Sequence, residues 1–353
     1  MQVLMGESIK PVTSRRGFLL TCGGAGASAL AAWRFLDQPH ARDGHTPDAA
    51  PGLTAVNRTS HALGSDISIL ALHESSSVGE TALDAAFAQL NHVERVMSIY
   101  LPDSQVSLLN TTGRLANPDP YLVSILQDAQ DLARRSDGAF DITVQSLWSI
   151  YAAAQRQGRL PSEAEIHAAQ RNVNWRQLTI SGGEIRFERP GMSLTLNGIA
   201  QGFAADRAME ALVNHGIKHA LVNTGEVASL GRKAGGAAWI AGIQHPRKND
   251  AYLGLARLEG RCLSTSGDYE TTFTPDKVNN HIFEPATGRS PQAFSSVTVL
   301  APTATEADAL STAIFVMGPE RGMALTQASQ NTDVLLVAKD GQTIATEGFP
   351  WNS

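Results

Sequence analysis

The spacing of apolar residues divides this chain into helices and short strands. Residues 65–72 (SDISILAL) alternate between polar and apolar positions, which is typical of a half-buried strand. Apolar positions recur with a helical period in several longer stretches. They predict helices at residues 81–97, 121–135, 147–157, 161–169, 198–215 and 304–317.

The second half of the chain is rich in short apolar runs between Gly and Pro turns. These runs predict strands at residues 178–180, 185–187, 193–196, 220–223, 239–244, 252–258, 261–264, 281–284, 296–301 and 334–338. Strands that follow one another with few helices between them favour an α+β fold with a largely antiparallel sheet over a doubly wound parallel sheet. No G-x-G-x-x-G follows a predicted strand and no G-x-x-x-x-G-K-[ST] occurs, which argues against a Rossmann or P-loop site.

Composition narrows the class of protein. The chain has 353 residues, of which 42% are hydrophobic and 18% charged, so it supports a sizeable core. Its net charge of −6 gives no basic surface for nucleic acid. Beyond the N-terminal segment, no stretch is long and apolar enough to span a membrane.

The N-terminus has the pattern of an export signal. Residues 14–19 (SRRGFL) form a twin-arginine pattern, and a Gly/Ala-rich apolar run with small residues for cleavage follows. We therefore expect a signal segment at residues 1–36, a flexible linker at 37–52 and one domain at 53–353. The expected location is the periplasm, reached by the twin-arginine route, with Cys262 as the one remaining cysteine and no internal disulfide.

The helix expected at 304–317 carries candidate metal ligands. Thr303 and Glu306 form a capping-box start. Asp308, Ser311 and Thr312 then lie on one helix face, and a carboxylate with two hydroxyls suits a hard cation such as Mg²⁺. The alternative is that the hydroxyls only satisfy the helix backbone.

Two glycine-containing segments have candidate binding roles. Residues 136–141 (SDGAFD) form a turn after a helix, and the amides that follow it would hold a ring edge or a ribose, unless the segment is a plain turn. Asn197 is a suitable N-cap for the next helix. Gly198 and Gly202 keep one face of that helix bare, either for a ligand or for close packing against a sheet.

Two further segments carry hydroxyls and a histidine. Residues 263–269 (LSTSGDY) place small hydroxyl side chains before a Gly-Asp turn, where they would meet phosphate oxygens. His281 enters an expected strand that ends in a Pro/Gly turn, and is a candidate acid or base or a structural histidine.

In this order, the segments resemble the ApbE family of FAD:protein FMN transferases. The similarity covers residues 63–322. Its motifs lie at residues 97–110, 136–143, 196–208, 220–226, 264–269, 281–288 and 304–318. The resemblance implies a T-fold-like α+β domain that binds FAD and Mg²⁺. Such enzymes transfer FMN to a Thr or Ser hydroxyl of a target protein and release AMP.

The resemblance also implies roles for individual residues. The metal positions are Gly198, through its carbonyl, with Asp308, Ser311 and Thr312, and the catalytic residues are Asp308 and His281, which orients or deprotonates the acceptor hydroxyl. The positions matching flavin-nucleotide contacts are Leu63, Tyr100, Ala139, Phe140, Asp141, Thr195, Gln201 and Ile282. Tyr100 offers a flat stacking surface.

Two positions depart from many members of the family. Thr195 and Gln201 stand where an acidic and a basic nucleotide contact are usual. The N-G-I-A-Q-G motif and the twin-arginine signal resemble the NosX branch, which implies the membrane flavoprotein NosR of nitrous oxide respiration as the target. Two other functions stay open: an FAD-binding or flavin-delivery protein without transfer activity, and an FAD pyrophosphatase in which water replaces the protein hydroxyl.

Overall fold

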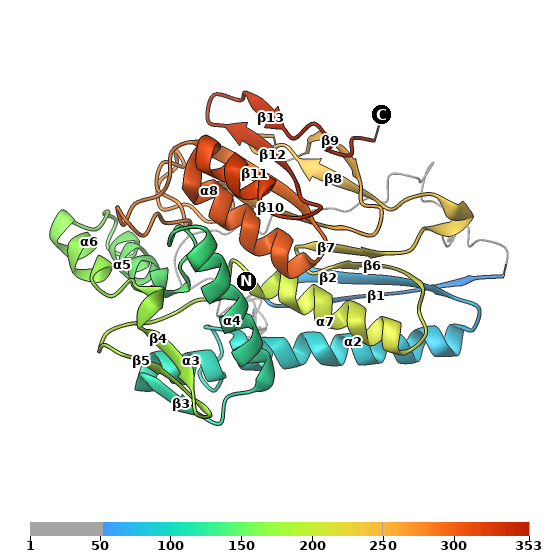
Figure 1. Cartoon of the computed structure of the whole chain (residues 1–353), viewed down its shortest axis with the longest axis horizontal. Coiled ribbons are helices and arrows are strands. Elements are labelled where there is room, and N and C mark those ends of the chain that lie inside the picture. The colour runs from blue at the N-terminus through green and yellow to red at the C-terminus, as the bar shows by residue number, and fades with distance from the viewer. Residues whose placement is uncertain (1–51, 249, 353) are drawn as a thin grey trace, which may run out of the picture.

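An antiparallel sheet of eight strands organises the chain, in the order β1-β2-β6-β7-β10-β11-β12-β13 (Figure 1). The computed structural model describes residues 52–248 and 250–352, so the expected signal segment and all of the linker except Gly52 lie outside the described residues. The strands are β1 (Thr54–Ala62), β2 (Ser65–His73), β6 (His219–Asn223), β7 (Val227–Leu230), β10 (Cys262–Gly267), β11 (Phe294–Ala301), β12 (Asp333–Ala338) and β13 (Thr343–Ala345). All neighbouring pairs are antiparallel, which confirms the expected α+β class.

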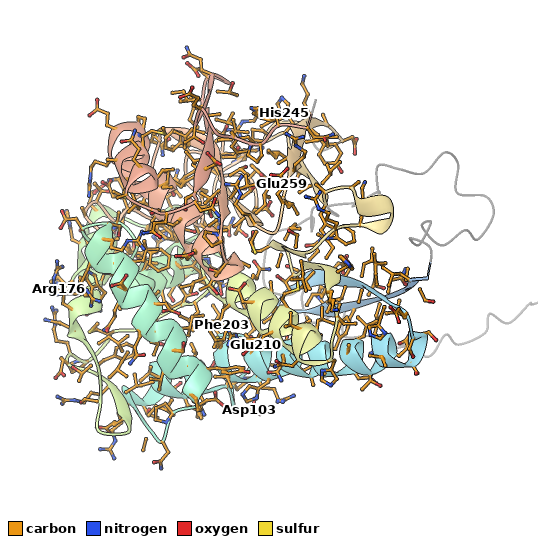
Figure 2. All side chains as sticks on the ribbon, turned by 45° about the vertical axis from the view of Figure 1, so that its right-hand side comes forward. Asp103, Arg176, Phe203, Glu210, His245 and Glu259 are labelled. Atoms are coloured by element: carbon orange, nitrogen blue, oxygen red, sulfur yellow. The ribbon has the colours of Figure 1, made fainter. Side chains whose placement is uncertain are left out.

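Helices cover one face of this sheet. These are α2 (Ser76–Met97), α7 (Ala200–Asn214) and α8 (Ala304–Gln327), with α4 (Pro120–Arg135) packed across them. Figure 1 shows α2 and α7 side by side beneath β1, β2 and β6. Phe203 of α7 meets Tyr121 of α4 edge to face, with 5.5 Å between ring centroids, where the two helices approach each other in Figure 2.

The other face of the sheet has its own apolar layer. The hairpin of β8 (Ile240–Gln244) and β9 (Tyr252–Arg257) packs there with residues from near the C-terminus. Because both faces are covered, every residue of β11 is buried. The strand therefore reads as a continuous apolar and small-residue run rather than as an alternating one.

Smaller elements complete the fold at one end. They are α3 (Gln105–Thr112), α5 (Gln145–Gln155), α6 (Glu163–Gln170), the three-stranded sheet β3 (Arg114–Ala116), β5 (Glu184–Phe187) and β4 (Leu178–Ser181), and the 3₁₀ turns η1 (Ile142–Val144), η2 (Trp175–Gln177) and η3 (Ala234–Gly236). Within the part of the chain that is described, no helix is both long and apolar enough to cross a membrane.

Two expected strands are wrong. At 193–196, the side chain of Asn110 takes the place of a neighbouring strand: its Nδ2 donates to the carbonyl of Leu194 (2.8 Å) and its Oδ1 accepts from the same residue's amide (2.7 Å). Residues 281–284 form only an isolated bridge, Glu284 with Arg289, at the turn that follows. Both segments have the right composition for a strand but no partner strand.

The helix expected to end at residue 317 continues after a break. Gly318 has φ 77° and Pro319 follows it, so the backbone leaves the helical conformation there before α8 resumes. The first part of α8, which carries the candidate ligands, therefore has the expected bounds.

Candidate functional site

The start of α8 is held by two separate caps. The hydroxyl of Thr303 accepts a hydrogen bond from the Glu306 amide (3.1 Å), which confirms the expected N-cap. The carboxylate of Asp206 on α7 accepts from the amides of Ala304 and Thr305, both at 2.9 Å. These bonds tie the two helices together one turn before Asp308.

Gly202 lets α7 and α8 touch. A Cβ at this position would lie 2.2 Å from the carbonyl oxygen of Ala304 and 2.8 Å from Cβ of Asp308. The Gly202 amide donates to Oδ2 of Asp308 (2.9 Å), so the close approach also holds the carboxylate. Of the two roles left open for this glycine, packing is the one observed, against a helix rather than the sheet.

Gly198 occupies a different position, beside the hydroxyl side chains. Its missing Cβ would lie 3.1 Å from Oγ1 of Thr312 and 3.6 Å from the ring of Phe140. The expected N-cap at Asn197 is wrong, because α7 begins at Ala200. The side chain of Asn197 instead hydrogen-bonds the hydroxyl of Tyr100, whose residue is 68% exposed at the rim.

A layer of hydroxyls joins α8 to the sheet. Oγ of Ser266 on β10 lies 2.7 Å from Oγ of Ser311 and 3.0 Å from Oγ1 of Thr312, and Ser311 donates to the carbonyl of Asp308 (2.8 Å). Each hydroxyl has one proton to give. We therefore assign donation from Thr312 to Ser266, then to Ser311, then to the Asp308 carbonyl, which leaves the lone pairs of Thr312 free.

Ser311 thus also fulfils the alternative expected for these hydroxyls, since its proton satisfies the helix backbone. Thr312 forms no such bond; among the described residues its hydroxyl forms a hydrogen bond only with Ser266. The two side chains are therefore not equivalent as ligands.

Two buried carboxyl groups lie in this layer without a counter-charge. Asp308 is 4% exposed, and burial raises its pKa to about 7, with the Gly202 amide acting in the opposite direction and Asp206 adding to the rise. Glu226 is 8% exposed, and burial, followed by the charge of Asp308, raises its pKa well above the ordinary value. Neither forms an ion pair with a described Lys, Arg or His.

The donor set fits a hard cation. It consists of carboxylate, hydroxyl and carbonyl oxygens, which Mg²⁺ prefers, and an arriving cation would balance the buried charge. Over residues 52–248 and 250–352, no three or more His, Cys, Asp or Glu side chains gather as a metal-binding group. The site is therefore rich in hydroxyls rather than a carboxylate cage, and leaves coordination positions for a ligand's own oxygens.

A sequence model of the ApbE family matches residues 63–336, most of the described chain. The chain belongs to the ApbE family. Among curated relatives, the FAD:protein FMN transferase of Escherichia coli (strain K12) is 30% identical over 272 residues, covering 73% of this chain and 77% of the relative. That of Treponema pallidum (strain Nichols) is 30% identical over 289 residues, covering 76% and 80%.

Solved ApbE structures share the fold. The flavin transferase ApbE from Vibrio cholerae superposes with a TM-score of 0.73 at 26% identity, covering 84% of this chain and 98% of the other. The apo flavinyl transferase ApbE of Pseudomonas stutzeri gives 0.73 at 29% identity, covering 84% and 95%. The comparisons confirm the family and the transferase class expected from the sequence.

The turn at 136–141 contributes less to the ApbE site than expected. The amides of Ala139 and Phe140 donate to the carbonyl and the hydroxyl of Ser136 (3.2 and 3.0 Å), so at these two amides the plain turn is the alternative observed. A helix-ending turn uses its own amides before a ligand can. The segment still borders the site, because the Phe140 ring lies against Gly198.

Asp141 has a structural role. Its Oδ1 accepts from the amide and the hydroxyl of Thr143 (2.8 and 2.6 Å), and its Oδ2 accepts from the amide of Trp175 (3.0 Å). The carboxylate thereby caps η1 and joins it to η2. Both carboxylate oxygens of Asp141 already accept hydrogen bonds from protein groups, so a contact with a ligand would come from its backbone.

The two neutral replacements also contact the protein. Gln201 donates through Nε2 to Oγ of Ser65 (2.7 Å) and to the carbonyl of Thr224 (3.1 Å), linking α7 to β2 and to the β6–β7 turn. Oγ1 of Thr195 accepts from the amide of Asn197 (3.2 Å), just before Gly198.

Leu63 lies at the β1–β2 turn with φ 54°, and its amide donates to Oε1 of Glu94 (3.0 Å). The turn adjoins Ser65, the first residue of β2, whose hydroxyl accepts from Gln201, so Leu63 lies near Gln201. The side chain of Ile282 is buried in the main apolar core.

His281 lies on the loop that follows β10. Its amide and its Nδ1 both lie near the carbonyl of Thr271 (3.0 and 3.2 Å). An acceptor beside Nδ1 assigns the proton to that nitrogen and leaves Nε2 as a base. Burial lowers the pKa of His281, while the Thr271 carbonyl and the charge of Asp268 act in the opposite direction.

Sequence reasoning assigned no role to Glu226. The residue closes the motif at 220–226, directly after a Thr-Gly turn, where a carboxylate between two buried strands is itself unusual. That burial is the signal that would have marked it.

Proposed function

We propose that the chain is a Mg²⁺-dependent FAD:protein FMN transferase. The hydroxyl oxygen of a Thr or Ser on a target protein attacks the phosphorus of the FMN half of FAD. The bond from that phosphorus to the bridging oxygen breaks, AMP leaves with this oxygen, and the hydroxyl proton passes to a base. The product is FMN joined to the target by a phosphoester.

The observation that carries this proposal is the buried oxygen cluster between α7, α8 and β10. Asp308, Ser311, Thr312 and the carbonyl of Gly198 would hold the cation, and the uncompensated carboxylates support its presence. When bound, Mg²⁺ supplies neutralisation of the diphosphate charge. The protein holds Asp308 in place through the Gly202 amide, so this carboxylate needs little reordering.

His281 is proposed as the base or orienter of the acceptor hydroxyl. Its Nε2 is left to accept a proton by the Nδ1 contact with Thr271, and its lowered pKa keeps the imidazole neutral near pH 7. Tyr100 is proposed to stack on the flat ring system, since its side chain is exposed and its hydroxyl is held by Asn197.

The remaining flavin-nucleotide contacts are proposed at Leu63, Ala139, Phe140, Asp141, Thr195, Gln201 and Ile282. Gln201 and Thr195 are uncharged, so the wall of the proposed FAD site that they form carries no charge. Because Gln201 is tied to Ser65 and Thr224, we expect the wall to be rigid and FAD to depend chiefly on the cation side for its charge balance.

We propose further that the protein acts in the periplasm after twin-arginine export, on a membrane flavoprotein of the NosR type. The support is the SRRGFL pattern at residues 14–19 and the N-G-I-A-Q-G motif. Fractionation of a tagged full-length chain tests the location, with Arg15→Lys/Arg16→Lys as the export-defective control. Recovery of both forms in the cytoplasm would contradict it.

The transfer itself is tested by mass spectrometry of a NosR acceptor domain incubated with the protein, FAD and Mg²⁺. We expect an FMN adduct on a Thr or Ser, with AMP released in equal amount. Free FMN and AMP without an adduct would assign an FAD pyrophosphatase, and tightly bound intact FAD would assign a carrier.

Asp308→Asn is the decisive variant for this assay. We expect at least about a hundredfold loss of adduct formation, the scale for losing one preorganised charge. The fold should persist, because the amide oxygen of Asn still accepts from Gly202. Glu306→Gln removes an exposed carboxylate from the same helix and should leave the rate unchanged; normal Mg²⁺-dependent transfer by Asp308→Asn would refute the metal assignment.

A further inference from the structure

Glu226 lies in the turn directly before β7, on the same side as Ala228, which belongs to the core beneath the helices. Leu263 pairs with Val227 at the end of the β7–β10 ladder, and continuing that register by one residue brings Glu226 beside Ser264 on β10. The carboxylate accepts hydrogen bonds from the Ser264 hydroxyl and the Thr265 amide. It is therefore connected to the hydroxyl layer through Ser264, whose hydroxyl lies 3.4 Å from that of Ser311.

One oxygen of this carboxylate has no partner. Oε2 of Glu226 is fully buried and receives no hydrogen bond from any described residue. The ionisable groups that act on it are Asp308 and Glu270, both acidic. A buried carboxylate that has one unpaired oxygen and no counter-charge is costly, so its presence calls for a positive group that joins it.

The turn before β7 does not need this side chain. The bonds that close the turn go to the backbone: the amide and the hydroxyl of Thr224 both donate to the carbonyl of Glu226 (3.0 and 3.4 Å). Any residue at this position would supply that carbonyl. The acidic side chain therefore has a role other than shaping the turn.

We infer that Glu226 is a positioning residue of the cation site, acting behind the ligands Asp308, Ser311 and Thr312. When a cation joins the site, the carboxylate of Glu226 supplies a second buried negative charge beside that of Asp308. It also accepts the proton of the Ser264 hydroxyl, which lies 3.4 Å from that of Ser311. Ser264 therefore does not compete with Ser266 as the donor to Ser311, and the donation order assigned to the hydroxyl layer is kept. This inference rests on the proposed Mg²⁺ site and adds a group that the expected ligands do not include.

The test measures binding of Mg²⁺ alone, by calorimetry on FAD-free protein. Glu226→Gln keeps the shape and removes the charge, and we expect its affinity to fall about tenfold to a hundredfold, the usual loss when a group behind the ligands is changed. Glu306→Gln, which removes one exposed charge from α8, should stay within about twofold of the wild type.

Thermal unfolding separates this role from a structural one. Without metal, Glu226→Gln should unfold at the same temperature as the wild type or higher, because Glu226 has no counter-charge that the substitution would remove. Its stabilisation by added Mg²⁺ should shrink. A lower metal-free unfolding temperature, or Mg²⁺ affinity equal to the wild type, would overturn the inference; a wild type that binds no Mg²⁺ would overturn the proposed metal site with it. Ser264→Ala, expected to weaken Mg²⁺ binding in the same direction, serves if Glu226→Gln does not fold.

Discussion

Gly202→Ala is expected to destabilise the protein by forcing α7 away from α8. The added methyl group would meet the backbone carbonyl of Ala304 at 2.2 Å and Cβ of Asp308 at 2.8 Å. Neither atom is the end of a flexible side chain, so the helices themselves must separate. The separation also stretches the 2.9 Å bond from the Gly202 amide to the Asp308 carboxylate.

The magnitude follows from three effects. Overpacking a close contact costs about 1–3 kcal/mol, and a hydrogen bond to a charged group contributes about 1.5–3 kcal/mol. Alanine offsets about 1 kcal/mol through its better helix propensity. We expect a net loss of about 1.5–5 kcal/mol, a large part of the roughly 5–15 kcal/mol by which a domain is usually stable.

Urea unfolding followed by tryptophan fluorescence, in EDTA, measures this loss directly. Gly198→Ala is the matched control, since its methyl group meets only the Thr312 side chain at 3.1 Å and the Phe140 ring at 3.6 Å. We expect it to cost less than about 1 kcal/mol, within the range of mild core changes, while it obstructs the proposed metal position and lowers FMN transfer. A wild-type midpoint for Gly202→Ala, or equal losses in both variants, would refute the reasoning.

Two further predictions concern single side chains. Because burial places the pKa of His281 below 6.5 in the fold, the unfolded chain binds its proton more readily, so stability present above about pH 6.5 is lost as pH falls toward the folded pKa. His281→Gln should remove this part of the loss when urea midpoints are compared from pH 5 to 7.5, and an unchanged difference between the two proteins across that range would contradict it. Burial raises the pKa of Cys262 to about 12, so its thiol should not react with a disulfide reagent at pH 8 in a Cys22→Ser chain until urea is added. Rapid reaction in the native state would show that the thiol is accessible.

The elements predicted correctly from the sequence are those that pack against the core along their whole length, because such packing produces a regular apolar pattern. The stripe on α2, for example, faces the core along its whole length, and the pattern located that helix. The edge strand β1 escaped notice because most of its side chains are at least partly exposed, so alternation is absent. Residues 193–196 misled for the opposite reason: the apolar residues are buried, but a single Asn110 side chain satisfies the backbone where a strand would.

The residues of the candidate site also differ in how far the sequence could identify them. Asp308, Ser311 and Thr312 were found because helical spacing alone puts them on one face. Gly198 and Gly202 look alike in sequence, yet one faces Thr312 and the other abuts the backbone of α8. They differ because α7 begins at Ala200, so that Gly198 precedes the helix and Gly202 lies in its first turn. Glu226 needed still more, because its nearness to Asp308 depends on the register of β7 with β10 and on which face α8 covers. The part of a site that lies within one helix is thus readable from spacing. The part that supplies its charge balance comes from strands far away in the chain, and there burial of a group that ought to be solvated is the observation that identifies it.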